Sequence, residues 1–126
     1  MAAALLLFAG CGEVKDGQYA EIAKCLTEKG VKFYGVYWCP HCSDQKKMFG
    51  DDLRYITYVE CDPRGANADP AACKAAGVQR YPTWGFPGQE NLVGPQEPAD
   101  LAKKANCEAA APNDTQAATA TSETQQ

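Results

Sequence analysis

The order of apolar and polar residues along the chain predicts a series of short helices and strands. In residues 19–26 apolar side chains recur at the i, i+3, i+4 and i+7 positions, which form one face of a helix. Gly30 is a suitable end for this helix. Residues 33–38 carry no charge and are rich in aromatic side chains, as expected of a buried central strand.

A second helix is predicted directly after this strand. Pro40 suits the first turn of a helix, residues 43–48 are compatible with one, and Gly50 offers an end. Residues 55–60 then predict a second strand, because turn-forming residues bound this segment on both sides.

A short helix, a hairpin and a final helix complete the predicted elements. Asp69 is a suitable N-cap for a helix with Pro70 at its first position. Residues 83–86 and 92–93 predict two strands joined by a turn, and residues 98–104 predict the last helix.

This order predicts an α/β fold with a central four-stranded mixed sheet flanked by helices. Alternating strands and helices favour parallel pairing of the early strands, and the hairpin adds antiparallel pairing. A length of 126 residues, of which 45% are hydrophobic, suits one domain with a real core. The domain is expected over residues 19–107, after a tether at 12–18. Residues 108–126 lack aromatic, large aliphatic and basic side chains, which predicts a disordered tail.

The N-terminus, residues 1–11, has the character of a signal segment. Its apolar residues end in a short stretch of small residues before Cys11, a pattern that resembles the bacterial lipobox, where the cysteine is acylated. No basic residue precedes the apolar segment, so either the true start lies upstream or the signal is atypical. An ordinary terminus with a chance cysteine is the alternative. An acylated Cys11 would tether the protein to a membrane surface.

Charge and cysteine content narrow the class of protein. The net charge of −4 argues against nucleic acid as a partner. No apolar run approaches the roughly 20 residues that a membrane-spanning helix needs. Seven cysteines in so short a chain fit an oxidising compartment, where disulfides stabilise small domains.

Cys39 and Cys42 carry the candidate chemistry. A C-x-x-C motif between a strand and a helix indicates a redox-active pair, because the helix N-terminus favours a thiolate at the first cysteine. His41 lies between them and is the only histidine. It could donate a hydrogen bond or charge to the Cys39 sulfur, which would make the disulfide more oxidising; an exposed imidazole without a role is the alternative. Half of a zinc site is also possible, but no second C-x-x-C pair follows.

Four further cysteines allow three pairings. Cys61 and Cys73 are separated by a loop that must fold back, so a disulfide between them is expected. Cys25 would then pair with Cys107 by elimination, which joins the first and last helices. The alternative is that Cys25 and Cys107 are free packed thiols, because these helices could lie on opposite faces of the sheet.

The chain resembles the thioredoxin-like domain that is attached to bacterial and plant vitamin K epoxide reductase homologues. The similarity covers roughly residues 19–107. The matching segments are residues 32–35, 37–42, 45–46, 58–61, 72–74 and 81–84. The resemblance implies a thioredoxin fold, disulfide formation on exported proteins in the bacterial cell envelope, and reoxidation by a quinone-linked membrane oxidase. It implies no cofactor beyond the redox-active disulfide.

Positions matched to the family imply roles for individual residues. Cys39 resembles the attacking thiol and Cys42 the resolving thiol. Pro82 resembles the cis-proline that faces the disulfide where substrate is held, with Trp38 and Tyr81 as further substrate contacts. The resemblance also supports a Cys61–Cys73 disulfide.

The chain departs from the family in two ways. No transmembrane oxidase domain is found in these 126 residues, so we expect the electrons to pass to a separate partner. Thioredoxins carry a buried acid six residues before the first cysteine, where Phe33 stands here. Glu60 is the candidate to replace that acid, although a strand residue of this kind is expected to face solvent.

Two other functions remain open. The protein could be a reductase or isomerase that repairs wrong disulfides. It could instead be a lipid-tethered module that binds a soft metal through its cysteines.

Overall fold

The computed structural model describes residues 14–107. The helices are α1 (Ala20–Glu28), α2 (Pro40–Phe49), the 3₁₀-helix η1 (Gly50–Tyr55), α3 (Pro70–Ala75) and α4 (Pro98–Lys104). The strands are β1 (Lys32–Gly35), β2 (Thr57–Glu60), β3 (Thr83–Gly85) and β4 (Leu92–Val93). The predicted signal segment with Cys11 and the predicted tail lie outside the described residues.

The four strands form one mixed sheet in the order β2-β1-β3-β4. Strand β1 runs parallel to β2 and antiparallel to β3, and β3 pairs antiparallel with β4. The predicted parallel pair and the predicted hairpin are both confirmed. The molecule is an α/β structure with a four-stranded mixed sheet flanked by helices, consistent with a thioredoxin-like fold.

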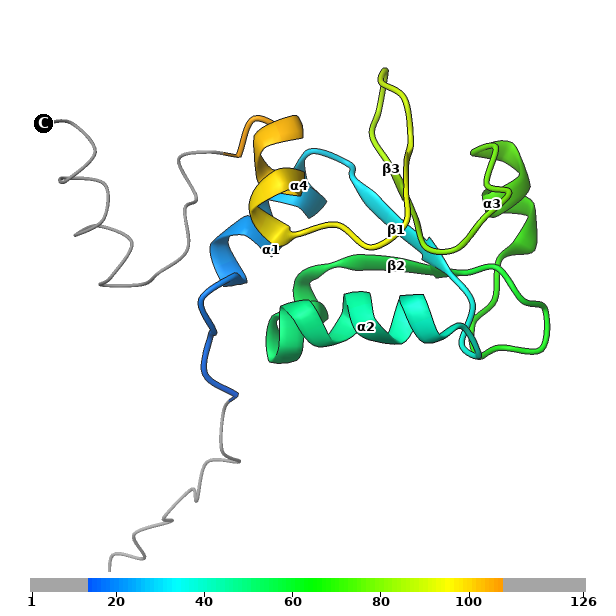
Figure 1. Cartoon of the computed structure of the whole chain (residues 1–126), viewed down its shortest axis with the longest axis horizontal. Helices are drawn as coiled ribbons and strands as arrows, with labels where there is room; N and C mark the ends of the chain where they lie inside the picture. Colours follow the sequence, from blue (N-terminus) through cyan, green and yellow to red (C-terminus); the bar gives the residue numbers. More distant parts are fainter. Residues whose placement is uncertain (1–13, 108–126) are drawn as a thin grey trace, which may run out of the picture.

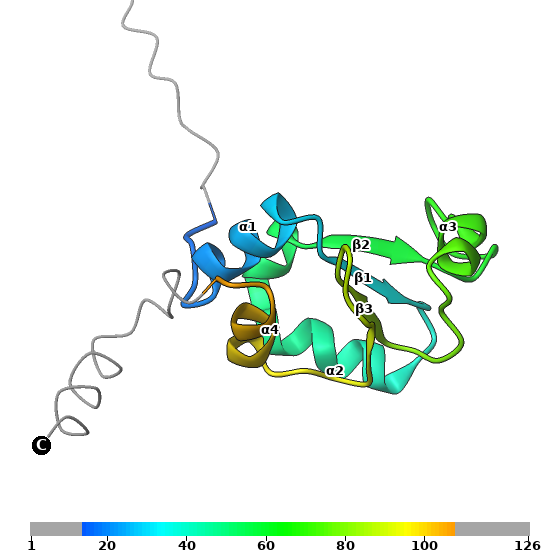
Figure 2. The same cartoon turned by 90° about the horizontal axis from the view of Figure 1, so that it is seen from above.

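Different helices lie at the two ends of the sheet. Helices α1 and α4 lie side by side at one end, and α3 lies at the other (Figures 1 and 2). Helix α2 follows one face of the sheet between these ends (Figure 1). No helix within residues 14–107 has both the length and the apolar character needed to cross a bilayer.

Aromatic side chains fill the space between α2 and the sheet. Phe33 stacks on Trp84 with ring centroids 4.9 Å apart, and Tyr58 meets Phe33 edge-on at 5.1 Å. Phe49 of α2 packs against the same tryptophan at 5.9 Å. Phe33 and Trp84 have no solvent exposure, so this cluster forms the centre of the core.

Gln45 is a fully buried polar residue on the inner side of α2. Its Oε1 accepts hydrogen bonds from Trp84 Nε1 at 2.9 Å and from the backbone N–H of Gln96 at 2.6 Å. Its Nε2 donates to the Gln96 carbonyl at 2.9 Å. Because buried polar groups need partners, this side chain fixes α2 against β3 and the segment before α4.

Three predicted strands extend beyond the observed ones, and for β3 the difference is one residue, since it ends at Gly85. The strand expected over residues 33–38 ends at Gly35, because the backbone turns back and Cys39 N–H donates to the Val36 carbonyl at 3.2 Å. Tyr37 and Trp38 are consequently more than half exposed, so the prediction that they are buried in a strand was wrong. Strand β2 starts at Thr57 instead of residue 55, since η1 extends through Tyr55.

The end formed by α1 and α4 is apolar and covalently closed. Ile22 and Leu26 of α1 and Leu101 of α4 have 1% exposure or less. A disulfide joins Cys25 to Cys107, 82 positions later in the chain. The two helices are therefore neighbours, and the concern that they would lie on opposite faces does not apply.

Candidate functional site

Cys39 occupies the N-cap of α2, directly after the turn that follows β1. The Cys39 sulfur accepts a hydrogen bond from the Cys42 backbone N–H at a distance of 3.4 Å. Pro40 takes the first helical position, where a missing N–H costs nothing. The predicted placement of the motif at a helix start is confirmed, and the helix dipole favours negative charge at this sulfur.

Within residues 14–107, Cys39 and Cys42 are the two cysteines that carry free thiols. Both are buried, but not equally: the exposed fraction is 8% for Cys39 and 1% for Cys42. A reactant from solvent therefore meets the Cys39 sulfur before it can meet Cys42. This order is compatible with the roles that the family resemblance implies, with Cys39 as the attacking thiol and Cys42 as the resolving thiol.

The segment before β3 lies against the Cys39 sulfur. The Cys39 thiol donates to the Tyr81 carbonyl at 3.7 Å, and the Tyr81–Pro82 peptide bond is cis. Pro82 is fully buried, whereas Tyr81 is partly exposed. Residues 42 positions apart in sequence are thus brought together at the thiol.

Cys42 points into the sheet. A Cβ atom added to Gly35 would meet the Cys42 sulfur at 3.0 Å and Cε2 of Tyr58 at 3.1 Å, so glycine at this position lets both side chains approach β1. Burial, with a smaller contribution from the neighbouring Cys39, raises the pKa of the Cys42 thiol to about 12. The charge of Lys46 and a backbone hydrogen bond at Val36 oppose this shift. Cys42 therefore stays protonated at neutral pH in the dithiol state.

Trp38 is held beside the motif by residues that the sequence did not indicate. Its indole N–H donates to Asp62 Oδ2 at 2.6 Å, and Arg64 donates to the same carboxylate through Nη2 at 2.7 Å and Nε at 3.1 Å. The Arg64 side chain thereby lowers the pKa of Asp62 well below its usual value, with help from Trp38. No local pattern connects positions 38 and 62, so only the fold reveals this contact.

Glu60 does not face solvent, and the expectation that it does was wrong. Only 4% of the residue is exposed. It is the last residue of the edge strand β2 and pairs with Gly35 at the end of β1, and the following loop folds over its side chain. A Cβ on Gly65 would come within 2.4 Å of Glu60 Cγ, which shows how closely this loop packs on it.

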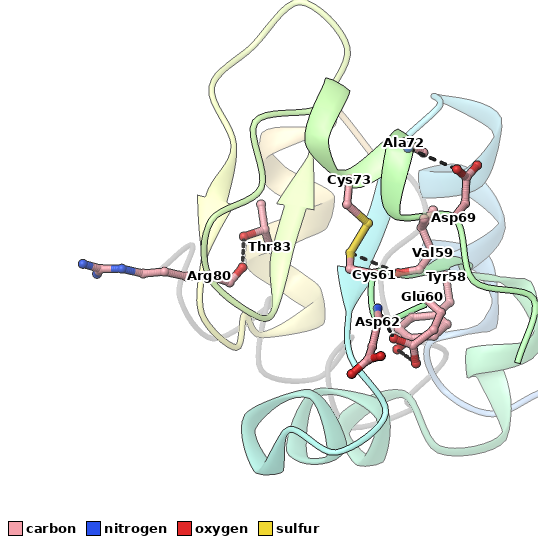
Figure 3. The surroundings of a disulfide bond; sticks show 10 residues. All are labelled: Tyr58, Val59, Glu60, Cys61, Asp62, Asp69, Ala72, Cys73, Arg80 and Thr83. Atoms are coloured by element: carbon pink, nitrogen blue, oxygen red, sulfur yellow. Dashed lines mark hydrogen bonds between the residues drawn. A yellow bond between two sulfur atoms is a disulfide. The ribbon is translucent and has the colours of Figure 1, made fainter. Parts of the chain in front are cut away.

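The loop that covers Glu60 is closed by a disulfide between Cys61 and Cys73. Figure 3 shows this bond linking the end of β2 to α3, with Asp62 and Glu60 on the same side of the loop. Asp69 caps α3 by accepting from Ala72 N–H at 3.1 Å, as the sequence predicted. The disulfide therefore fixes the segment that holds both buried carboxylates.

His41 is exposed on the first turn of α2. The hydrogen-bond partners of the Cys39 sulfur are Cys42 N–H and the Tyr81 carbonyl, so the imidazole is not among them. An electrostatic role for His41 stays a prediction. Among the side chains of residues 14–107, no group of three or more His, Cys, Asp or Glu is arranged to hold a metal ion.

Comparison with known proteins links this site to redox chemistry. No protein-family model matches the chain. Over 86 residues it is 40% identical to the thiol-disulfide oxidoreductase LTO1 of Arabidopsis thaliana. The alignment covers 65% of this chain but 23% of LTO1, so the chain spans less than a quarter of that protein's length. The similarity supports an oxidoreductase with a thioredoxin-like fold.

Proposed function

We propose that this protein exchanges disulfides with cysteines of other proteins through its Cys39–Cys42 pair. The observation that carries the proposal is the position of the Cys39 sulfur. It sits at the N-terminus of α2, next to the Cys42 amide and beside the Tyr81 carbonyl. A helix start stabilises a thiolate, and a second thiol three residues later can close a disulfide with it.

The exchange follows from the different burial of the two sulfurs. A substrate thiolate attacks Cys39 of the oxidised pair, the Cys39–Cys42 bond breaks, and Cys42 leaves and takes up a proton. A second substrate thiolate then attacks the substrate sulfur of the mixed disulfide, and Cys39 leaves as a thiolate. The substrate has lost two electrons and gained a disulfide, and the protein holds two thiols. The reverse sequence reduces a substrate disulfide.

Exposed groups around Cys39 suit a polypeptide substrate. Tyr37 and Trp38 are 54% and 57% exposed, which is unusual for large aromatic side chains on a small domain. The bond from Trp38 to Asp62 holds the indole in one orientation, so it offers a fixed apolar surface at low entropic cost. Tyr81 is partly exposed and its carbonyl lies 3.7 Å from the Cys39 sulfur, so it extends the predicted contact region, whereas the side chain of Pro82 is buried.

The proposed direction is oxidation, in the bacterial cell envelope. Two structural disulfides within residues 14–107 suit an oxidising compartment. The lipobox-like segment supports attachment to a membrane surface through acylated Cys11. The resemblance to domains attached to vitamin K epoxide reductase homologues supports exported proteins as substrates and a quinone-linked membrane oxidase as the partner that restores the disulfide.

The reduction potential of the Cys39–Cys42 couple tests this direction. We would equilibrate the full chain with glutathione buffers and quantify the oxidised pair. A potential of roughly −120 to −180 mV supports a disulfide donor or isomerase, and a value near about −270 mV indicates a reductase. His41→Ala should shift an oxidising potential toward the reducing range if the imidazole stabilises the thiolate. Lys47→Ala, which removes an exposed cation further along α2, is the matched control.

Substitution of each thiol tests the assigned order. Cys39→Ser should abolish exchange with a reduced, unfolded substrate protein. Cys42→Ser should accumulate a mixed disulfide that is visible on a non-reducing gel. Full activity of Cys39→Ser would contradict the proposal.

A further inference from the structure

We propose that the buried Glu60 carboxylate, acting through the Tyr58 hydroxyl, takes up and returns the proton of the Cys42 thiol. This inference rests on the proposed disulfide exchange, because only that reaction requires Cys42 to change its protonation. Cys42 is the residue that reacts, and Glu60 and Tyr58 act on the reaction by changing the protonation of Cys42.

Glu60 and Tyr58 form a connected pair on β2. The Tyr58 hydroxyl donates to Glu60 Oε1 at 3.2 Å, and the Asp62 backbone N–H donates to Oε2 at 3.0 Å (Figure 3). Both oxygens of the carboxylate are therefore hydrogen-bonded. Since Glu60 is 4% exposed and covered by the loop at Gly65, its route to other groups leads through the tyrosine.

The ring of Tyr58 lies close to the buried Cys42 thiol, while its hydroxyl contacts the carboxylate. Its ring edge and the Cys42 sulfur both lie about 3 Å from the point where a Cβ of Gly35 would stand, so they are neighbours above β1. Phe33 packs on one side of the ring, and Lys46 Nζ lies 4.2 Å from its centroid. These contacts fix the ring, and the hydroxyl is directed to Glu60.

The charged and titratable groups around Cys42 come from two elements. Helix α2 contributes Cys39 and Lys46, and β2 contributes Tyr58, whose hydroxyl in turn contacts Glu60. Burial, followed by the charge of Glu60, raises the pKa of Tyr58 above its usual value. The hydroxyl thus keeps its proton at rest and can pass one proton to Glu60 as it accepts another.

Disulfide exchange needs a group that takes the proton from Cys42 in one direction and returns it in the other. During reduction of a substrate, Cys42 must lose its proton before its thiolate attacks Cys39 in the mixed disulfide and releases the substrate thiol. During oxidation of a substrate, Cys42 leaves as a thiolate and must gain a proton. Cys42 is 1% exposed, so solvent is poorly placed to serve either step. Phe33 stands where thioredoxins carry their buried acid, and Glu60 enters the same region from the neighbouring strand.

Stopped-flow reaction of the reduced full chain with the coloured aromatic disulfide dithiobisnitrobenzoate separates the two thiols. Attack by Cys39 releases one coloured thiolate at a rate that depends on reagent concentration. Attack by Cys42 on the mixed disulfide releases the second coloured thiolate at a rate that is independent of reagent concentration. We would record both rates between about pH 5 and pH 10.

Glu60→Gln and Tyr58→Phe should slow the second release at least about tenfold near pH 7, in line with the loss of a general base. The difference from the wild type should shrink toward high pH, where hydroxide deprotonates Cys42 directly. The first release should not change. Glu60→Gln keeps the size and the hydrogen-bonding capacity of the side chain, and Glu90→Gln removes an exposed carboxylate as a matched control.

An unchanged second release in both variants, or a slowing by the same factor at every pH, would overturn the inference. If Glu60→Gln does not fold, Tyr58→Phe alone decides, because it retains the packed ring. A wild-type protein that releases only one coloured thiolate would instead contradict the proposed exchange, so the two failures are distinguishable.

Discussion

Each end of the sheet is closed by a disulfide, but the two ends are built differently. The Cys25–Cys107 bond joins α1 to the segment just after α4, beside the apolar contact of these two helices, and connects residues 82 positions apart. The Cys61–Cys73 bond spans 12 positions and closes a loop with two buried carboxylates, Glu60 and Asp62. The first bond restrains the chain as a whole, and the second restrains the surroundings of the reactive thiols.

This difference suggests that one disulfide mainly stabilises the fold and the other mainly maintains the surroundings of the thiols. Cross-linking distant positions removes more conformational freedom from the unfolded chain than cross-linking near ones. Holding Asp62 and Glu60 in place affects Trp38 and Tyr58, which lie next to Cys39 and Cys42. The thiols therefore depend on the second disulfide more than on the first, although the first contributes more to folding.

The largest expected effect comes from removing the Cys25–Cys107 bond. In the chain-entropy model, a loop of this length corresponds to about 4.5 kcal/mol at 25 °C. We expect the double variant Cys25→Ser, Cys107→Ser to lose approximately this amount in urea unfolding followed by the fluorescence of buried Trp84. The rates of both coloured-thiolate releases should be unchanged under conditions where the variant is folded. A change in the second release alone would show that the two ends are not independent.

Removing the Cys61–Cys73 bond should cost less stability and affect the site more. The same model gives about 3 kcal/mol for this shorter loop. In the double variant Cys61→Ser, Cys73→Ser, we expect a slower second release, because the loop no longer fixes Glu60. Trp38 should also become more accessible to a soluble fluorescence quencher as Asp62 loosens. Unchanged quenching and an unchanged second release would contradict the role assigned to this disulfide.

Sequence patterns predicted the frame of the molecule because local rules determine it. Pro40 and Pro98 mark the starts of α2 and α4, and the apolar spacing of α1 places Ile22 and Leu26 in the core. The parallel pair and the hairpin followed from the order of elements. The position of Cys39 at a helix N-cap followed from the motif and its proline alone.

Contacts between distant segments were beyond such patterns. Glu60 was expected to face solvent because a single acidic residue in a strand usually does, yet the loop closed by Cys61 and Cys73 covers it. Trp38 was expected inside a strand, but a turn after Gly35 exposes it and brings its indole to Asp62. Whether such a residue is buried depends on where a later loop packs, and the spacing of apolar residues along the chain does not determine that.

The smallest expected effect concerns the pH dependence of the contact between Trp38 and Asp62. The side chain of Arg64, followed by its backbone N–H and by Trp38, lowers the pKa of Asp62 well below 3.8. A carboxyl group whose pKa is lower in the folded state contributes stability above its unfolded pKa and loses that contribution as the pH falls through the folded pKa. Accessibility of Trp38 to quencher should therefore stay constant from pH 7 to about pH 4 and rise only at more acid pH.

Two variants test whether the change in quencher accessibility with pH comes from the contact between Trp38 and Asp62. Trp38→Phe reports the remaining signal of Trp84, which should stay constant until the protein unfolds. Asp62→Asn retains an oxygen that can accept from the indole but removes the ion pair with Arg64, so the change in accessibility at acid pH should disappear. A rise in Trp38 accessibility near pH 4, where a free aspartate titrates, would mean that Arg64 does not hold the carboxylate in solution. The loop would then be looser than its disulfide implies, and the contrast between the two ends would rest on chain entropy alone.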